Sequence, residues 1–240
     1  MPSIEETLDR LAITFTVKDV MTPRAGLVCG VNSADAGRVS DENPDFDVIP
    51  IQKDGTLVGY FERNSGRTSR IAPTDLVSDG TNLLDLVDIL EDRQFSFVLS
   101  RHKIEGYIHY SDLNHQLMKL TFYVILEALE RAALNSIEGR NDAECLRKDL
   151  GSARFKQIEE AYKRAGLAAR SLRSYLNLSD ILRIATETGL MKADDGLIKA
   201  MKKVRDGAAH VSENLVSSYD DVKRLARVKR ECLRILATSR

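Results

Sequence analysis

Residues 205–210 read Arg-Asp-Gly-Ala-Ala-His, which places a permanent cation, a carboxylate and an imidazole within six positions. An imidazole can take the proton of a ribose 2′-hydroxyl or return one to a leaving oxygen near neutral pH. A guanidinium can hold a phosphate and the charge that builds on it. Together these groups supply what metal-free RNA cleavage needs, so Arg205, Asp206 and His210 are the first catalytic candidates.

The spacing of these three residues limits how they can meet. Five residues along an ideal helix turn by about 140°, so Arg205 and His210 would not share one face of a continuous helix. Either the helix loosens at Gly207, or the two side chains meet in a site built from two subunits. Asp206 and His210 are four apart, so they can meet directly, and the carboxylate would then orient the imidazole and raise its pKa. A capping and ion-pair cluster at a helix end is the structural alternative.

The second half of the chain has the periodicity of helices. All five prolines lie at or before Pro73, so the strongest helix breaker is absent from the rest of the chain. Apolar residues at helical spacing predict five amphipathic helices, which together describe a small bundle. They include a stripe over 122–133, a polar segment over 140–165, a short helix over 178–185, one that Asp194 or Asp195 opens, and one over 222–235.

The first half predicts a mixed α/β fold with an internal repeat. Two short apolar runs, 48–51 and 57–61, flank the turn signal Asp54-Gly55 and predict a hairpin. The pattern returns in 95–99 and 104–108, around a polar turn at 101–103. Thr81 is expected to cap a helix before the second hairpin. The segment 33–40 is a shorter and poorer version of that helix.

Three motifs in this half resemble a tandem pair of cystathionine-β-synthase (CBS) domains. They are VKDVMTP at 17–23, IPIQKDGTLVG at 49–59 and GYIHYSDL at 106–113. The resemblance covers residues 13–118 and leaves 1–12 as an N-terminal extension. It implies a pseudo-symmetric module whose clefts bind adenosine-containing ligands (ATP, ADP, AMP or S-adenosylmethionine), and which often forms dimers.

The resemblance also implies which residues bind the nucleotide. Asp112 matches the family's ribose-binding aspartate, and a carboxylate can accept hydrogen bonds from both ribose hydroxyls. Tyr107, His109 and Gly106 belong to the same motif, although His109 stands where the family usually has threonine. In the first repeat the aspartate position falls near Ser65, so at most one good site is expected. The alternatives are that Asp112 caps the next helix and that the pair only dimerises.

Residues 119–240 resemble the HEPN superfamily, whose all-helical domains occur in many ribonucleases and toxins. The hallmark is an arginine, a polar residue and, a few positions later, a histidine, which Arg205, Asp206 and His210 match. The resemblance implies a metal-independent endoribonuclease with its cleft at a homodimer interface. His210 would be the general acid or base, Arg205 would stabilise the transition state and Asp206 would position His210. The product would be a 2′,3′-cyclic phosphate, and no catalytic cofactor would be required.

Composition sets the remaining limits. Residues 1–112 hold 11 Lys and Arg against 19 Asp and Glu, a net charge of −8; residues 113–240 hold 24 against 17, a net of +7. Complementary domains or subunits, or a basic half that meets RNA, both account for this division. No run is long enough to span a membrane, and three scattered cysteines suggest neither disulfides nor a metal site. A cytoplasmic location is the expectation.

Two function hypotheses remain open at this point. One is an endoribonuclease regulated by an adenine nucleotide. The other is a non-catalytic nucleotide-sensing protein, in which both domains serve as dimerisation or partner-binding modules.

Overall fold

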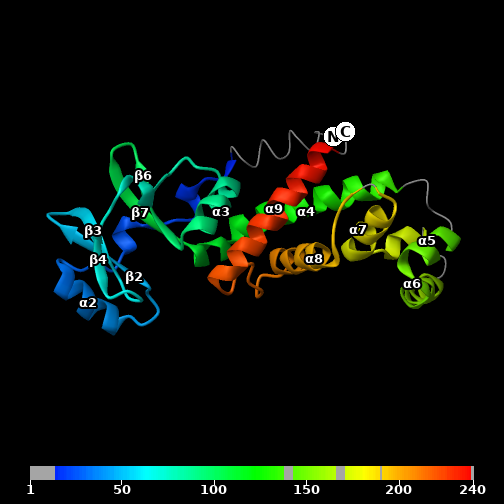
Figure 1. Cartoon of the computed structure of the whole chain (residues 1–240), viewed down its shortest axis with the longest axis horizontal. Coiled ribbons are helices and arrows are strands. Elements are labelled where there is room, and N and C mark those ends of the chain that lie inside the picture. Colours follow the sequence, from blue (N-terminus) through cyan, green and yellow to red (C-terminus); the bar gives the residue numbers. More distant parts are fainter. Residues whose placement is uncertain (1–13, 138–142, 166–170, 190, 239–240) are drawn as a thin grey trace. The chain divides into compact units, whose positions relative to one another are not determined.

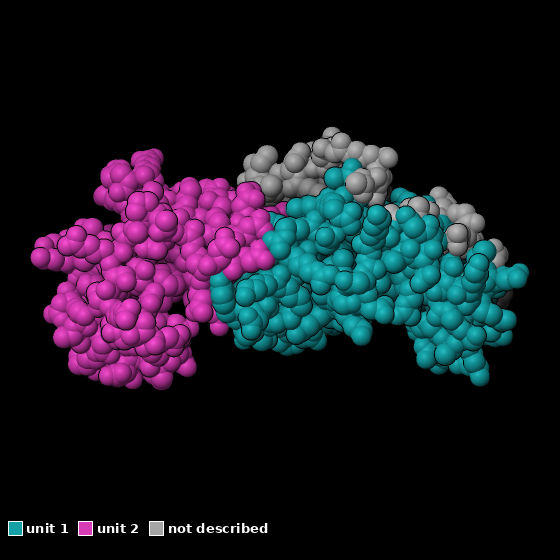
Figure 2. All heavy atoms as spheres, in the orientation of Figure 1, with its two compact units in different colours: residues 1–9, 118–240 teal, residues 10–117 magenta. Residues whose placement is uncertain are grey.

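The computed structural model describes residues 14–137, 143–165, 171–189 and 191–238. The chain divides into two compact units, one over Arg10–Leu117 and one that contains Met118–Arg240. Figure 2 colours them separately, and Figure 1 labels their helices and strands. The first unit is mixed α/β and the second is helical. The predicted extension 1–12 lies outside the described residues.

The α/β unit is built around the two predicted hairpins, and both are confirmed. The first consists of β2 (Val48–Lys53) and β3 (Thr56–Glu62), and β4 (Arg67–Arg70) adds a third antiparallel strand. The second consists of β6 (Phe95–Ser100) and β7 (Lys103–His109). Its sheet has the order β1-β7-β6-β5, with β1 (Thr22–Pro23) antiparallel to β7 and β5 (Leu76–Ser78) parallel to β6.

The two hairpins agree residue by residue. Val48 pairs with Glu62 in the first copy, and Phe95 pairs with His109 in the second. Each first strand has its register shift after the fourth residue, at Ile51 and at Val98. A parallel bridge from Gly30 to Ile51 matches the pairing of β5 with β6. The internal repeat is therefore a repeat of structure as well as of sequence.

A helix precedes each hairpin. These are α2 (Ser33–Glu42) and α3 (Leu83–Asp92), of ten residues each, so the expectation of a shorter first helix is wrong. Asn32 and Asn82 cap them, since each side chain accepts the N–H of the aspartate three residues later. The predicted cap at Thr81 is thus one residue early. Short 3-10 helices complete the unit: η1 (Val17–Asp19), η2 (Arg24–Gly26), η3 (Pro73–Asp75) and η4 (Tyr110–Asn114).

Aromatic side chains from both hairpins form the centre of this unit. Tyr60 lies 5.1 Å from Phe95 and 5.6 Å from Phe97, measured between ring centroids. Tyr107 stacks on Phe95 at 5.7 Å, and Phe97 is completely buried. Such ring pairs add to the free energy gained by burying their area. This cluster fixes the position of β7, which carries the sequence-predicted site.

Close approach of a third strand explains a glycine that recurs in both copies. Gly106 pairs with Pro23 of β1, and a Cβ at Gly106 would lie 2.4 Å from the Met21 sulfur and 2.9 Å from the Thr22 carbonyl oxygen. In the first copy Gly59 pairs with Arg70 of β4, and a Cβ there would lie 2.5 Å from the Ser69 carbonyl oxygen. Both positions require glycine because the neighbouring backbone leaves no room for a side chain.

The helical unit contains α4 (Gln116–Ser136), α5 (Ala143–Leu150), α6 (Ser152–Ala165), α7 (Leu178–Glu187), α8 (Asp195–Ala209) and α9 (Tyr219–Thr238), with η6 (Leu172–Tyr175) before α7. The predicted apolar stripes of α4, α7, α8 and α9 are buried. The polar segment 140–165 is two helices rather than one, because Gly151, with φ of 79°, ends α5. Within the described residues, no helix combines the length and apolar character that a membrane span requires.

Candidate functional site

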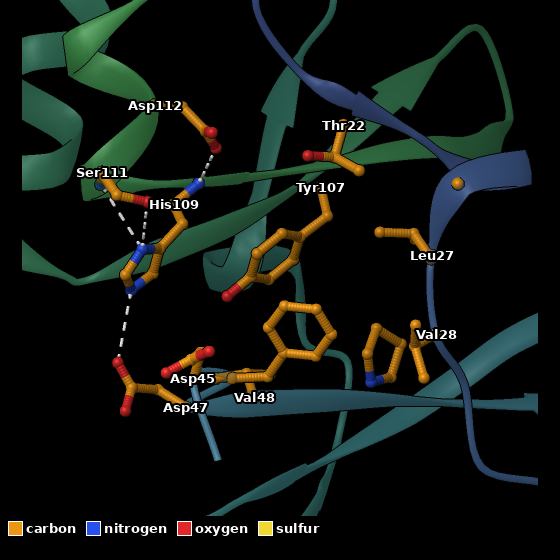
Figure 3. Close-up of a pocket in the computed structure, with 13 residues that line it drawn as sticks. Thr22, Leu27, Val28, Asp45, Asp47, Val48, Tyr107, His109, Ser111 and Asp112 are labelled. Carbon is orange, nitrogen blue, oxygen red and sulfur yellow. Dashed lines mark hydrogen bonds and ion pairs between the residues drawn. The ribbon is translucent and has the colours of Figure 1, made fainter. Parts of the chain in front are cut away.

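A cavity of about 250 Å³ opens in the α/β unit beside the end of β7 (Figure 3). Tyr107, His109 and Asp112 line one wall, so the structure brings together three of the four residues predicted for nucleotide binding. The fourth, Gly106, lies outside the lining. Its role is indirect, since it lets β1 approach and so places Thr22, which does line the cavity.

Asp112 owes its position to the short helix η4. Its Oδ2 accepts the His109 backbone N–H at 2.8 Å, as the third residue of a capping box. Asp112 thus has a capping role within η4, whereas the residue before α4 is His115, whose Nδ1 accepts the Leu117 N–H at 3.3 Å. Burial raises the pKa of Asp112, while the His109 N–H and the charge of His115 oppose that shift. Among the described residues, Oδ1 accepts no hydrogen bond and remains available to a ligand.

His109 bridges the two copies of the repeat. Its Nδ1 lies 2.9 Å from the Ser111 hydroxyl and accepts the Ser111 backbone N–H at 3.4 Å. That places the ring proton on Nε2, which lies 3.7 Å from Asp47 Oδ2 (Figure 3). Nε2 is buried and has no hydrogen-bond partner among the described residues. Burial lowers the pKa of His109, and Asp47 only partly offsets this, so the ring is neutral at pH 7.

The opposite wall comes from the segment that enters β2. Asp45, Phe46 and Asp47 line the cavity there, and Leu27 and Val28 extend its apolar part. Phe46 is 43% exposed and Val28 is 41% exposed, so both leave apolar area open to a ligand. Burial, then the charges of Asp112 and Asp47, raise the pKa of Tyr107, which keeps its hydroxyl neutral and able to donate.

Arg63 holds this opposite wall in place. Its guanidinium donates to the carbonyl oxygens of Ser40, Asn43 and Phe46, the last at 3.1 Å. Sequence reasoning missed Arg63 as a positioning residue, and it missed Asp45 and Asp47 as lining residues. The signal available was two aspartates around an exposed aromatic residue immediately before a buried strand.

The first copy carries a comparable carboxylate only after an additional strand. Beyond β4 the Ala72 N–H is donated to Asp75 Oδ2 at 2.8 Å in a capping box of η3, as the His109 N–H is donated to Asp112 in η4.

Directly after the hairpin, however, the first copy has a serine. Arg63 N donates to Asp47 O at 2.9 Å, as Tyr110 N donates to Gln94 O at 2.9 Å, so the two copies leave their hairpins in the same register. Two residues beyond each of these donors stand Ser65 and Asp112. Ser65 donates its hydroxyl to Glu62 at 3.1 Å. Ser65 therefore stands where the aspartate would directly follow the hairpin, and the Asp-Leu pair with its capping box recurs at Asp75, after β4.

In the helical unit, the three catalytic candidates do not converge. Arg205 and Asp206 are half-buried and line a separate cavity of about 280 Å³ together with Lys202, Glu130 and the first turn of α7. His210 is exposed and caps the C-terminus of α8. Within the described part of the chain no side-chain hydrogen bond or ion pair joins Asp206 to His210, so their predicted direct contact is not formed within one protomer.

The helix also does not loosen at Gly207. α8 continues to Ala209, and a Cβ at Gly207 would lie 3.0 Å from the Asn214 carbonyl oxygen. The glycine therefore allows the following loop to pack on α8. Of the two arrangements that could bring Arg205 and His210 together, the site built from two subunits stays a prediction.

A buried lysine organises the backbone around His210. Lys119, on α4, is only 3% exposed, and its ammonium donates to the carbonyl oxygens of His210 (3.3 Å), Val211 (3.0 Å) and Glu213. These carbonyls lie at and beyond the C-terminus of α8, where a cation is favoured. The sequence signal was a lysine inside the apolar stripe of α4, three positions before Phe122.

Comparison with known proteins finds solved structures of CBS domains. One is the CBS domain of a bacterial CNNM/CorC family Mg²⁺ transporter, both alone and in complex with the inhibitor IGN95a; it is 18% identical, with 49% of this chain and 86% of that chain covered, at a TM-score of 0.36. Another is a haemolysin-like protein containing a CBS domain from Oenococcus oeni PSU, 16% identical, with 48% and 98% covered, at a TM-score of 0.36.

No protein-family model matches the sequence, and no curated protein matches it. A TM-score of 0.36 is too low to transfer a ligand or a site from the solved structures. The residues of the cavity beside β7 must therefore carry any functional assignment.

Proposed function

We propose that this protein is a regulatory protein that binds a nucleoside-containing ligand in the cavity beside β7. The candidate ligands are adenine nucleotides (ATP, ADP or AMP) and S-adenosylmethionine. The observation that carries the proposal is the Asp112 carboxylate, which has one oxygen fixed by the His109 N–H and the other available at the cavity.

The chemistry of the cavity suits a nucleoside. An ionised carboxylate can accept both hydroxyl protons of a ribose, and the neutral Tyr107 hydroxyl can donate to the ligand. Leu27, Val28 and Phe46 offer an apolar surface for a base. A volume of about 250 Å³ is at the small end for ligand cavities, which favours the smaller of these candidates.

Calorimetry on the full chain tests this proposal. Adenosine, AMP, ADP, ATP and S-adenosylmethionine are titrated in turn, and at least one is expected to bind. Asp112→Asn should weaken that ligand by at least about tenfold, because a hydrogen bond to a charged acceptor is replaced by one to a neutral acceptor. Asp75→Asn, which changes the comparable capping-box carboxylate of the first copy, is the control and should bind normally. Absence of heat with all five ligands would end the proposal.

A second candidate function, a metal-independent endoribonuclease, rests on Arg205 and Asp206. These residues line a polar cavity with Lys202, and His210 is exposed at the end of the same helix. In a homodimer, Arg205 would hold the scissile phosphate while His210 of the partner subunit takes the 2′-hydroxyl proton. The 2′-oxygen then bonds to phosphorus, the bond to the 5′-oxygen breaks, and the leaving oxygen gains a proton. A 2′,3′-cyclic phosphate results.

RNA cleavage in excess EDTA tests the second candidate. We expect a 2′,3′-cyclic phosphate end, and we expect His210→Ala to abolish cleavage while the circular dichroism spectrum is unchanged. His102→Ala, at an exposed hairpin turn, is the matched control. Light scattering establishes whether the active species is a dimer. Full activity of the His210 variant, or activity confined to a monomer, would exclude this mechanism.

A further inference from the structure

We infer that the cavity beside β7 selects nucleosides that carry no phosphate, and that it prefers a cationic 5′ substituent to a neutral one. The inference rests on the proposed nucleoside site and specifies its ligand class. It follows from the charge of the lining and from the occupation of the two backbone N–H groups at the start of η4.

All the full charges on the lining are negative. Asp45 and Asp47 stand on the segment before β2, and Asp112 stands on the opposite wall (Figure 3). Among the residues that the structure describes, no lysine or arginine lines this cavity. A phosphate group inside so small a volume would lie close to at least one carboxylate, where like charges repel. An ammonium or sulfonium group would instead be attracted.

The histidine on the wall does not change this balance. His109 accepts the Ser111 N–H through Nδ1, so its one ring proton is on Nε2 and faces Asp47. The ring is therefore neutral. Burial lowers the pKa of His109 and so opposes the uptake of a second proton when a ligand binds. A phosphate would have to recruit a second proton to obtain a cationic partner here.

Two backbone donors beside the cavity, the N–H groups of His109 and Ser111, are also occupied. Anions bind well at free N–H groups of a helix N-terminus. At η4 the His109 N–H is donated to the Asp112 carboxylate at 2.8 Å, and the Ser111 N–H is donated to the His109 ring. The protein's own carboxylate therefore takes one of the positions that a phosphate oxygen would need.

Two arginines whose segments adjoin the cavity walls, Arg63 and Arg24, are directed elsewhere. Arg63 donates to three backbone carbonyls of the α2–β2 segment. Arg24 precedes the lining residue Gly26, but one of its terminal nitrogens lies 3.8 Å from the Cβ position of Gly55, in the β2–β3 turn. Neither guanidinium lines the cavity, so neither compensates the three carboxylates.

Three ligands that differ only at the 5′ position provide the test: adenosine, 5′-amino-5′-deoxyadenosine and AMP, titrated calorimetrically into the full chain. AMP is expected to bind at least about tenfold more weakly than adenosine, and the amine more tightly than adenosine. The double variant Asp45→Asn, Asp47→Asn should bring the three affinities closer together. Asp41→Asn, an exposed aspartate on α2 outside the cavity, is the control and should preserve the wild-type order.

The outcomes separate the two proposals. If AMP binds as tightly as adenosine or more tightly, the inference on charge is overturned and the nucleoside site stands. If the double variant keeps the full discrimination, Asp45 and Asp47 are not its source and the inference is likewise overturned. If none of the three ligands binds, and the nucleotides and S-adenosylmethionine also fail, the proposed function itself is wrong.

Discussion

The two copies of the hairpin repeat share a framework but differ in the segment that leaves its last strand. Both have the same pairing register, the same position for the bulge and a glycine under a third strand. After β3 the chain turns at Gly66 into β4 and only then forms η3 with Asp75, whereas directly after β7 it forms η4 and places Asp112 at a cavity. The candidate cavity thus depends on this exit segment as well as on the hairpin strands.

The first copy still contributes to the site that the second copy carries. It supplies Asp45, Phe46 and Asp47, which Arg63 holds through three backbone carbonyls. The repeat therefore gives one cavity with two dissimilar walls, one that carries the ribose-binding candidate and one that sets the charge.

Among the substitutions that test this comparison, Phe97→Ala is expected to have the largest effect on the free energy of unfolding. Phe97 is completely buried in the aromatic cluster of the second copy, and its loss should lower the free energy of unfolding by about 3–5 kcal/mol. Denaturant unfolding measures the change. Val58→Ala, in β3 and 44% exposed, is the control and should stay within about 0.5 kcal/mol. Similar effects of the two substitutions would contradict the central role of the cluster.

An intermediate effect is expected when alanine replaces the repeated glycine. Gly106→Ala and Gly59→Ala should each destabilise the fold by about 1–3 kcal/mol, because each Cβ meets the adjacent strand. Only Gly106→Ala should also weaken ligand binding, since it displaces β1 and therefore Thr22. Thermal unfolding and calorimetry on both variants provide the measurements. Equal loss of affinity in the two variants would show that β4 also shapes the cavity.

The smallest effect concerns His109 and pH. Its pKa is lowered in the fold, so the unfolded chain binds the proton more readily. Stability is therefore present above the ordinary value of 6.5 and is lost as the pH falls below it. Unfolding at pH 7.5 and 5.5 should show a shallower loss in His109→Gln than in the wild type, with His102→Gln as the control substitution.

The raised pKa of Asp112 acts in the opposite direction, since its contribution is lost as the pH rises. The contribution of His109 is therefore read from the difference in free energy of unfolding between the variant and the wild type. The pH dependence of the wild type alone combines both residues. If the free energies of unfolding of the variant and the wild type differ by the same amount at both pH values, the proposed pH effect of His109 is contradicted.

Local patterns predicted the parts of this fold that local physics determines. The apolar runs around Asp54-Gly55 were sufficient to predict the first hairpin, and the apolar stripes were sufficient to predict α4, α7, α8 and α9. In each case the apolar residues that repeat at the period of the element are the buried ones. The strand β4 was not predicted, since Arg-Thr-Ser-Arg is polar and mostly exposed and gains its strand geometry only by pairing with β3.

The candidate site divides in the same way. Asp112, His109 and Tyr107 lie close together in sequence, so one motif pointed to all three. Asp45 and Asp47 reach the same cavity only because the two hairpins pack face to face through their aromatic cluster, and that is tertiary information. For Arg205 and His210, the spacing of the motif did not predict the direction in which each side chain points.

Lys119 affects how mutational data on the helical unit should be interpreted. The ammonium donates hydrogen bonds to three carbonyl oxygens at and beyond the end of α8. Any shorter or apolar replacement therefore removes all three hydrogen bonds at once. A saturation scan scored by growth or by activity would then rank position 119 beside the catalytic candidates, although its ammonium donates to backbone carbonyls. An arginine replacement, which keeps the charge and the reach, is the informative substitution for separating support of the loop from chemistry.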